Sequence, residues 1–239
     1  MTELIYQTDS YLKEFQATVI GADPEAHAVA LDRTIFYPGG GGQPADSGWL
    51  EWQGTRLPVE RTRKAPDGIW HTLAAAAPLP AIGAQVSGRI DWQRRYALMR
   101  THTAMHILCG VVFRDYGAQV TGGDMEPLHG RMDFEFESLT RDLVSVIEQS
   151  VNREVQAARD IRIAILPREE AFKIPDLIRT KINLLPPEIS HIRTIELAGL
   201  DLQADGGTHV HNTSEVGRMR IVDYKSKGRI NKRVYVELD

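Results

Sequence analysis

Two histidines four residues apart, His102 and His106, are the first side chains in this sequence whose type and spacing could support chemistry. Residues at i and i+4 lie one above the other on a helix face, so both imidazoles could reach one metal ion. Because no Glu follows His102, the H-E-x-x-H pattern of metalloproteases is absent, and with it the usual general base for peptide hydrolysis. Histidines at this spacing are also common as structural or surface residues, so a metal site and a structural role are both open.

A second group of candidate ligands lies in the segment DGGTHVH, from Asp205 to His211. Its paired glycines allow the backbone to turn sharply, and potential ligands follow them at once. If a strand begins at His209, His211 would point to the same side of that strand. The alternative is a glycine turn that enters a strand with partly exposed histidines.

The segment TIFYPGGGGQP, residues 34–44, contains four consecutive glycines. Such a run exposes backbone N–H groups, which suit a phosphate or the end of an RNA strand. The segment lacks the Lys-Ser/Thr ending of a nucleotide-binding P-loop, so it does not indicate a nucleotide site. A flexible hairpin loop is the alternative interpretation.

Basic residues gather in two places along the chain. Between positions 218 and 233 there are seven of them against one acidic residue, Asp223. They are Arg218, Arg220, Lys225, Lys227, Arg229, Lys232 and Arg233. A hairpin with this excess can contact phosphates, although lysines also protect the exposed edge strand of a sheet. A second basic cluster, Arg89, Arg94, Arg95 and Arg100, comes just before the histidine pair.

The composition of the 239-residue chain limits what these sites can be. Hydrophobic residues make up 42% and charged residues 25%, which is typical of a globular protein. The single cysteine, Cys109, excludes an internal disulfide and a zinc site built on several thiolates. The formal net charge of −4 gives no overall sign of nucleic-acid binding, so an RNA contact must come from a local patch. With no signal-peptide pattern and no apolar run long enough for a bilayer, we expect a cytoplasmic protein without membrane contact.

Residues 1–90 are expected to form a small β-barrel domain that contains the glycine-rich segment. Short strand-like runs at 16–20 and 27–31 are separated by a turn, and Gln53-Gly54-Thr55 joins two further runs as a hairpin. Several short strands at about ten-residue spacing are typical of a small barrel or sandwich.

Residues 91–239 are expected to form an α+β domain with a mostly antiparallel sheet, which makes the fold class α+β. Apolar residues at helical spacing predict a helix over 92–116, ended by Gly117, that carries the first histidine pair. A second amphipathic helix is predicted over 139–155, opened by Ser138. Strands are predicted at 131–136, 161–165, 216–224 and 229–238, the last two paired as a terminal hairpin.

Taken in order, three segments resemble the freestanding alanyl-tRNA editing proteins, the AlaX family. The segment from Phe36 to Gly48 resembles that family's glycine-rich barrel motif, and Arg100 to Leu108 resembles its H-x-x-x-H helix. The segment DGGTHVHNTSEVG, residues 205–217, resembles its C-G-G-T-H-V-x-x-T-x-E-[IV]-G motif. Alanyl-tRNA synthetases contain the same module and threonyl-tRNA synthetases a related one. The resemblance implies an editing module that acts without an attached synthetase.

The resemblance implies a zinc site formed by His102, His106, Asp205 and His209, with the three histidines as catalytic centre. Asp205 stands where the family has a cysteine. A carboxylate oxygen can bind Zn²⁺ at about 2.0–2.2 Å but is harder than a thiolate, so the metal selectivity should be less biased towards zinc. Two alternatives stay open: Asp205 lies away from the ion and a water takes its place, or His211 is a substitute ligand.

The implied reaction is hydrolysis of the ester that links a wrong amino acid, serine or glycine, to tRNA for alanine. The metal would either activate a water or hold the substrate. Gln43, Thr103 and Thr208 are expected around the aminoacyl end. The residues expected to contact tRNA are Arg94, Arg95, Arg100, Arg229, Lys232 and Arg233. The alternatives are a metal-dependent hydrolase of small esters or amides with no RNA partner, and a tRNA-binding module that has lost its metal.

Overall fold

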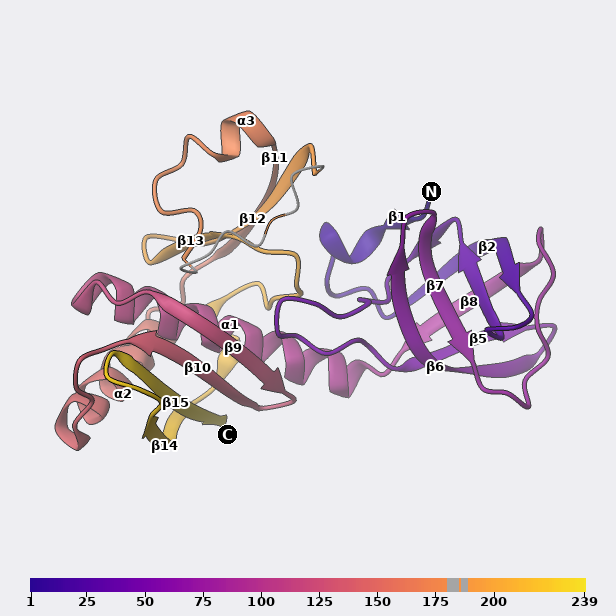
Figure 1. Ribbon diagram of the computed structural model, residues 1–239. Helices are drawn as coiled ribbons and strands as arrows, with labels where there is room; N and C mark the ends of the chain where they lie inside the picture. The colour runs from indigo at the N-terminus through magenta and orange to yellow at the C-terminus, as the bar shows by residue number, and fades with distance from the viewer. Residues whose placement is uncertain (180–184, 186–188) are drawn as a thin grey trace. The chain divides into compact units, whose positions relative to one another are not determined.

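The computed structural model describes residues 1–179, 185 and 189–239, and it divides the chain into two compact units, Met1–Tyr96 and Ala97–Asp239 (Figure 1). The division falls inside helix α1 (Trp92–Tyr116), a few residues after the boundary expected at position 90. The mixed α+β class is confirmed, since the chain combines a closed barrel with helices and antiparallel sheets.

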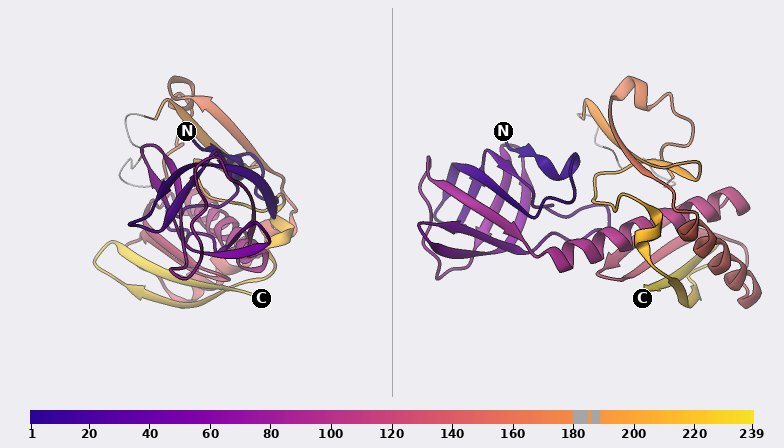
Figure 2. Two further views of the ribbon diagram at one scale, coloured as in Figure 1. Left: turned by 90° about the vertical axis from the view of Figure 1, so that its right-hand side faces the viewer. Right: turned by 180° about the vertical axis from the view of Figure 1, so that it is seen from behind.

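The first unit is a closed barrel in which neighbouring strands pair antiparallel, and the left view of Figure 2 looks into it. Around the barrel the strands are β2 (Glu14–Asp23), β3 (Ala28–Leu31), β7 (Gly68–Leu73), β6 (Thr55–Ala65), β5 (Gly48–Trp52) and β8 (Gln85–Ile90). Side chains such as Phe15, Leu50 and Leu57 fill the interior, because alternate residues of a strand face the same side. Gln53 and Gly54, both at positive φ, confirm the hairpin predicted between β5 and β6.

Short elements complete the first unit. They are the parallel pair β1 (Glu3–Leu4) and β4 (Arg33–Thr34) and the 3₁₀ helix η1 (Ile5–Gln7).

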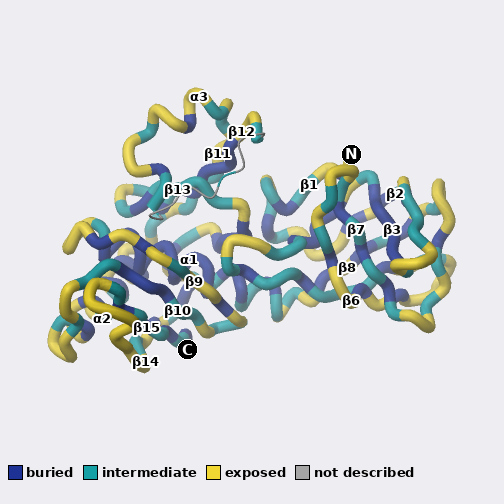
Figure 3. The backbone as a smooth tube through the Cα atoms, in the orientation of Figure 1, coloured by how far each residue is buried: buried dark blue, intermediate teal, exposed yellow. Residues whose placement is uncertain are grey.

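Helix α1 begins and ends where the sequence predicts. The Asp91 carboxylate accepts a hydrogen bond from Arg94 N (3.1 Å), and Gly117 has φ of 64°, the left-handed conformation that commonly ends helices. Residues 101–112 are buried on all sides of the helix (Figure 3). This part of α1 therefore belongs to the core of the second unit, and any polar side chain that it carries is placed in the interior.

The described part of the second unit contains two antiparallel sheets. The larger sheet has the order β14 (Met219–Ser226), β15 (Asn231–Leu238), β10 (His129–Glu135) and β9 (Val120–Glu126). The smaller sheet has the order β11 (Ile161–Pro167), β12 (His191–Leu197) and β13 (Asp201–Ala204). Alternate residues of the larger sheet, including Met132, Phe134 and Val234, are buried, so one of its faces packs on the core.

Helix α2 (Arg141–Gln156) packs against β14 and the 3₁₀ helix η2 (Thr213–Val216), and a short α3 (Arg168–Ala171) follows β11. The prediction that Ser138 opens α2 is wrong. Thr140 caps the helix, because its Oγ1 accepts a hydrogen bond from Leu143 N (3.2 Å). Strands β9, β12 and β13 were not predicted from the sequence.

A buried arginine, Arg95, joins three parts of the first unit. Its side chain has no exposed surface, and its Nε donates to Asp46 Oδ1 (2.9 Å), while a second bond joins Nη2 to Oδ2. The same guanidinium donates to the carbonyl oxygens of Ser10 (2.9 Å) and Ile35 (2.6 Å). This placement corrects the expectation that Arg95 contacts tRNA, because its charge and its donors are used inside the unit.

We expect Arg95→Ala to lower the free energy of unfolding by about 3–5 kcal/mol, since removing one partner leaves the Asp46 carboxylate buried and uncompensated. Urea unfolding followed by tryptophan emission measures this loss, because all four tryptophans lie in the first unit. Arg33→Ala is the matched control: Arg33 pairs with Glu3 at the surface, and its loss should cost about 0–1 kcal/mol. Equal, small losses in both variants would contradict this account.

A buried histidine gives the barrel a pH-dependent stability. His71 on β7 has no exposed surface, with Nε2 at 3.0 Å from Thr34 Oγ1 and Nδ1 at 3.4 Å from the Val29 carbonyl oxygen. Burial lowers the pKa of His71 to about 4, and the bond to Val29 opposes this shift only in part. The imidazole is therefore neutral in the folded protein at neutral pH.

Between pH 6.5 and about 4, the unfolded chain binds a proton at His71 that the folded chain does not. The free energy of unfolding should therefore fall as the pH falls through this window, by up to about 3 kcal/mol. Urea unfolding at a series of pH values tests this, and His71→Gln should show a shallower pH dependence. His129→Gln is the control, because His129 is exposed and lies in the second unit. An unchanged pH dependence in His71→Gln would refute the assignment.

Candidate metal centre

Helix α1 places His102 and His106 in the interior of the second unit. Their exposed fractions are 4% and 6%, and their ring centroids are 5.2 Å apart. His209 joins them, with its ring centroid 4.2 Å from that of His102 and 4.7 Å from that of His106. The structure thus brings together both motifs that the sequence offered as candidate ligands.

The segment that follows β13 is an irregular loop and not a strand from His209 onward. Inside this loop the Asp205 carboxylate accepts a hydrogen bond from Gly207 N (2.7 Å), which shapes the turn that brings His209 back towards α1. His211 is exposed and does not join the buried group, so the geometry gives no support to it as a substitute ligand.

Asp205 lies among the three histidines. Its Oδ2 is 3.0 Å from His209 Nε2, and its Oδ1 is 3.5 Å from His102 Nε2. The ligand atoms of His102, His106, Asp205 and His209 all lie within 4.8 Å of one another, so this group could hold a metal ion. Three imidazole nitrogens and one carboxylate oxygen are donors that divalent transition metals accept.

The protonation states of these side chains suit metal binding. Burial lowers the pKa of His102 to about 4 and holds the pKa of His209 well below its ordinary value. Burial alone would raise the pKa of Asp205, but the neighbouring histidines outweigh it and hold that pKa well below the ordinary value. At neutral pH His102 and His209 are therefore neutral imidazoles with free lone pairs and Asp205 is a carboxylate, which are the forms that bind metals.

Two polar side chains lie next to the Nδ1 atoms of His106 and His209 and orient these rings. Asp201 Oδ2 lies 3.3 Å from His106 Nδ1, and this buried carboxylate helps to raise the pKa of His106 although burial opposes it. Thr103 Oγ1 lies 3.2 Å from His209 Nδ1. A partner at one ring nitrogen fixes the orientation of an imidazole and leaves the other nitrogen for a metal.

Asp201 and Arg193 were missed from the sequence. Asp201 Oδ2 accepts a hydrogen bond from Gln203 Nε2 (2.6 Å) and Oδ1 accepts one from Arg179 Nε (3.2 Å), so it is itself held in place. Arg193 on β12 donates from Nη1 to the carbonyl oxygens of Asp205 (3.0 Å) and Gly207 (2.9 Å), which fixes the ligand loop. Neither residue belongs to a motif with regular spacing, so only the fold reveals them.

The residues expected around the aminoacyl end are buried in different units. Thr103 and Thr208 have no exposed surface in the second unit and adjoin the histidines in sequence and, for Thr103, by contact. Gln43 lies in the first unit, 2% exposed, in a turn where Gly40 N and Gln43 N each donate to the other residue's carbonyl oxygen. The four glycines, Gly39 to Gly42, all have positive φ, a conformation that other residues rarely adopt.

Most of the basic residues expected to contact tRNA are engaged within their own unit. Arg94 donates to the Ala45 carbonyl oxygen, and Arg100 donates to those of Val216 and Asp239. The Lys232 ammonium is held by the carbonyl oxygens of Gly228 (2.8 Å) and Arg229 (2.9 Å). Arg233 makes two bonds to the Asp133 carboxylate (2.6 and 2.8 Å), while Arg229 is exposed.

Comparison with known proteins decides the family. The sequence-family model of class II (A) tRNA synthetases matches residues 6–94. The family model of the second additional domain of threonyl and alanyl tRNA synthetases matches residues 192–235. An alanyl-tRNA editing protein AlaX-M from Saccharolobus solfataricus is 39% identical over 237 residues, which cover 98% of each chain. The chain belongs to the alanyl-tRNA editing protein family. An AlaX-M protein from Methanosarcina barkeri is 36% identical and covers 100% of this chain and 99% of its own length.

A much longer protein, an alanine–tRNA ligase, is similar to this chain over only part of its own length. An alanine–tRNA ligase from Ignicoccus hospitalis is 38% identical over 227 residues, which are 92% of this chain but only 24% of the ligase. The resemblance noted in the sequence is thereby confirmed at the level of the family.

Among the helices of the described residues, none is long and apolar enough to cross a membrane.

We expect one divalent ion per chain, and loss of that ion in His106→Ala and His209→Ala. The matched control is His211→Ala, because His211 lies two residues from His209 but is exposed and outside the group. Elemental analysis of protein purified without chelator and calorimetric titration with Zn²⁺ measure stoichiometry and affinity. Full metal content in His209→Ala, or its loss in His211→Ala, would contradict the ligand set.

Proposed function

We propose that this protein hydrolyses the ester bond that joins a wrong amino acid, serine or glycine, to tRNA for alanine. The observation that carries the proposal is the buried group of His102, His106, Asp205 and His209 in a chain that matches editing proteins along its whole length. The alanine–tRNA ligase contains a similar segment as about a quarter of its length, which favours an editing module that acts in trans.

We assign the metal as Zn²⁺, held by the three histidines and Asp205. Such an ion would supply Lewis-acid chemistry, either by lowering the pKa of a water or by holding the amine and hydroxyl of the substrate. The carboxylate of Asp205 is harder than the thiolate that the family motif carries, so the site should be less selective for zinc. Asp201 and Thr103 keep His106 and His209 in the orientations that the site needs.

Polar groups at the site would let the protein distinguish serine from alanine on the tRNA. A site that binds the serine hydroxyl leaves its own polar atoms unpaired when alanine enters, which penalises the correct substrate. Thr103, Thr208 and Gln43 are the side chains that we propose for this environment. Exposed cationic side chains would bind the tRNA partner. Among the residues that the sequence predicts as tRNA contacts, Arg229 is exposed. Because charged tRNA is the substrate, we place the protein in the cytoplasm.

The deciding experiment compares hydrolysis of seryl-tRNA and alanyl-tRNA, both on tRNA for alanine. We expect faster release of serine, with His106→Ala losing turnover by several orders of magnitude while tRNA binding stays largely intact. Asp205→Cys should keep the activity and retain zinc more strongly, whereas Asp205→Ala should lose both. Equal hydrolysis of the two substrates, or none of either with metal supplied, would overturn the editing function.

A small ester such as p-nitrophenyl acetate tests the alternative of a hydrolase with no RNA partner. We expect kcat/KM for this ester to be lower than for seryl-tRNA by orders of magnitude, because the RNA contributes binding energy. Comparable values would favour the alternative.

A further inference from the structure

The barrel carries a concentration of positive charge that no ion pair among the described residues neutralises. Strand β6 contains four cationic side chains, Arg56, Arg61, Arg63 and Lys64, which we call the β6 cations, against one acidic residue, Glu60. They are exposed, or half-buried in the case of Arg63. In the described part of the chain none of the β6 cations takes part in an ion pair. They differ in this respect from Arg95 and Arg233, which pair with Asp46 and Asp133.

Protection of a sheet edge does not explain the β6 cations. Lysine and arginine often cover an exposed edge strand, and this reason applies to the terminal hairpin, because β14 lies at the edge of its sheet. Strand β6 pairs with β5 on one side and β7 on the other, in a barrel that is closed. Its backbone groups are already paired, so its excess of positive charge needs another reason.

Half-exposed tryptophans lie on both strands next to β6. The guanidinium carbon of Arg56 is 4.3 Å from the ring centroid of Trp49 on β5, and that of Arg63 is 5.5 Å from the ring centroid of Trp70 on β7. Arg89 on the next strand, β8, approaches Trp49 from 5.8 Å. Such cation–π contacts keep a guanidinium next to an aromatic ring, so each pair offers a positive charge and a flat ring at one place on the surface.

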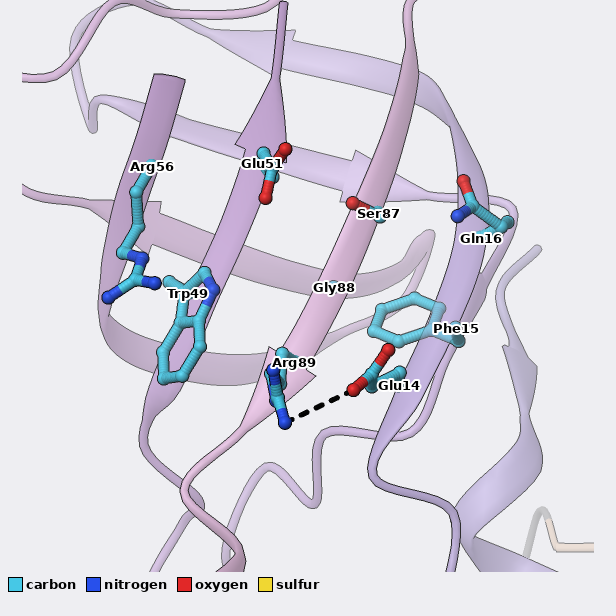
Figure 4. A pocket seen from close by; sticks show the side chains of 9 residues that line it. All are labelled: Glu14, Phe15, Gln16, Trp49, Glu51, Arg56, Ser87, Gly88 and Arg89. Atoms are coloured by element: carbon cyan, nitrogen blue, oxygen red, sulfur yellow. Dashed lines mark ion pairs between the residues drawn. The ribbon is translucent and has the colours of Figure 1, made fainter. Parts of the chain in front are cut away.

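A shallow hollow of about 280 Å³ lies beside Trp49 (Figure 4). Its lining includes Ser87 and Gly88 of β8. Glu14, in an ion pair with Arg89, and Glu51 supply carboxylate oxygens at its margins. The hollow is slightly smaller than typical small-molecule sites of about 300–1,000 Å³, so it suits one flat group rather than a whole ligand.

We propose that the outer surface of β5, β6, β7 and β8 binds RNA, with Arg56, Arg61 and Arg63 on phosphates and the ring of Trp49 as a stacking surface for an unpaired base. These four strands hold five basic and two acidic residues, in a chain whose net charge is negative. Phosphate contacts by Lys and Arg next to aromatic rings are the usual features of single-stranded RNA binding. In naming the RNA as tRNA, the inference rests on the proposed function.

The first test is the salt dependence of binding to uncharged tRNA for alanine, measured by fluorescence anisotropy. The double variant Arg56→Gln with Arg63→Gln should raise Kd about tenfold or more and reduce the slope of log Kd against log salt by about two. The matched control is Arg33→Gln with Arg162→Gln, which removes the same charge from exposed arginines that pair with Glu3 and Glu196. Wild-type Kd and slope in the first variant would overturn the inference.

Tryptophan emission gives a second readout that does not depend on the loss of charge. Because all four tryptophans lie in the first unit, tRNA bound to this surface should change the emission, and Trp49→Phe should remove much of that change. Binding of tRNA without any change in emission would contradict the proposal. Thermal unfolding of each variant shows whether the barrel is intact.

Kinetics separate this inference from the proposed function. In an active deacylase, the Arg56→Gln, Arg63→Gln variant should raise KM for seryl-tRNA and leave kcat near the wild-type value. Turnover with an unchanged KM would refute the RNA surface and keep the proposed function. Absence of deacylation in the wild type, together with tRNA binding that still depends on Arg56 and Arg63, would refute the function and keep the surface.

Discussion

A carboxylate enclosed by three imidazoles is the interaction on which the second unit depends. A charge largely removed from water needs an ion pair or hydrogen bonds, and the half-buried Asp205 has them through His209, His102 and the backbone N–H of Gly207. Around it, Arg193 fixes the loop by two carbonyl oxygens, and Asp201 fixes His106. The site is thus preformed by its own side chains.

Features of the fold and the site could be predicted where a pattern of neighbouring residues in the sequence indicates them. The histidine pair on α1 and the end of that helix at Gly117 follow from helical spacing and from glycine conformation, and both were predicted correctly. Strand β9 was missed because its sequence, VTGGDME, shows no alternation of apolar and polar residues. Strand β12 was missed because four consecutive residues of it are buried, which hides the period of two.

Contacts between distant segments are beyond local patterns. Asp201 supports His106 although 95 positions separate them, so no spacing rule connects the two residues. The direction of an arginine side chain is also beyond local patterns. A cluster of basic residues in the sequence does not reveal whether a guanidinium points into the protein or towards solvent. Arg95 is wholly enclosed, whereas Arg56, which belonged to no predicted cluster, is exposed over a tryptophan ring. The fold therefore separates charge that holds a unit together from charge that is available to a partner.

The candidate ligands come from two segments about a hundred residues apart, His102 and His106 on α1 and Asp205 and His209 in the loop after β13. An ion bound to all four would link these two segments in the folded chain. An ion that binds only the folded form, at a free concentration a thousand times its dissociation constant, stabilises that form by about 4 kcal/mol. Metal supply would then set the lifetime of the protein as well as its chemistry, so a cell short of the ion would lose the protein itself to unfolding and proteolysis.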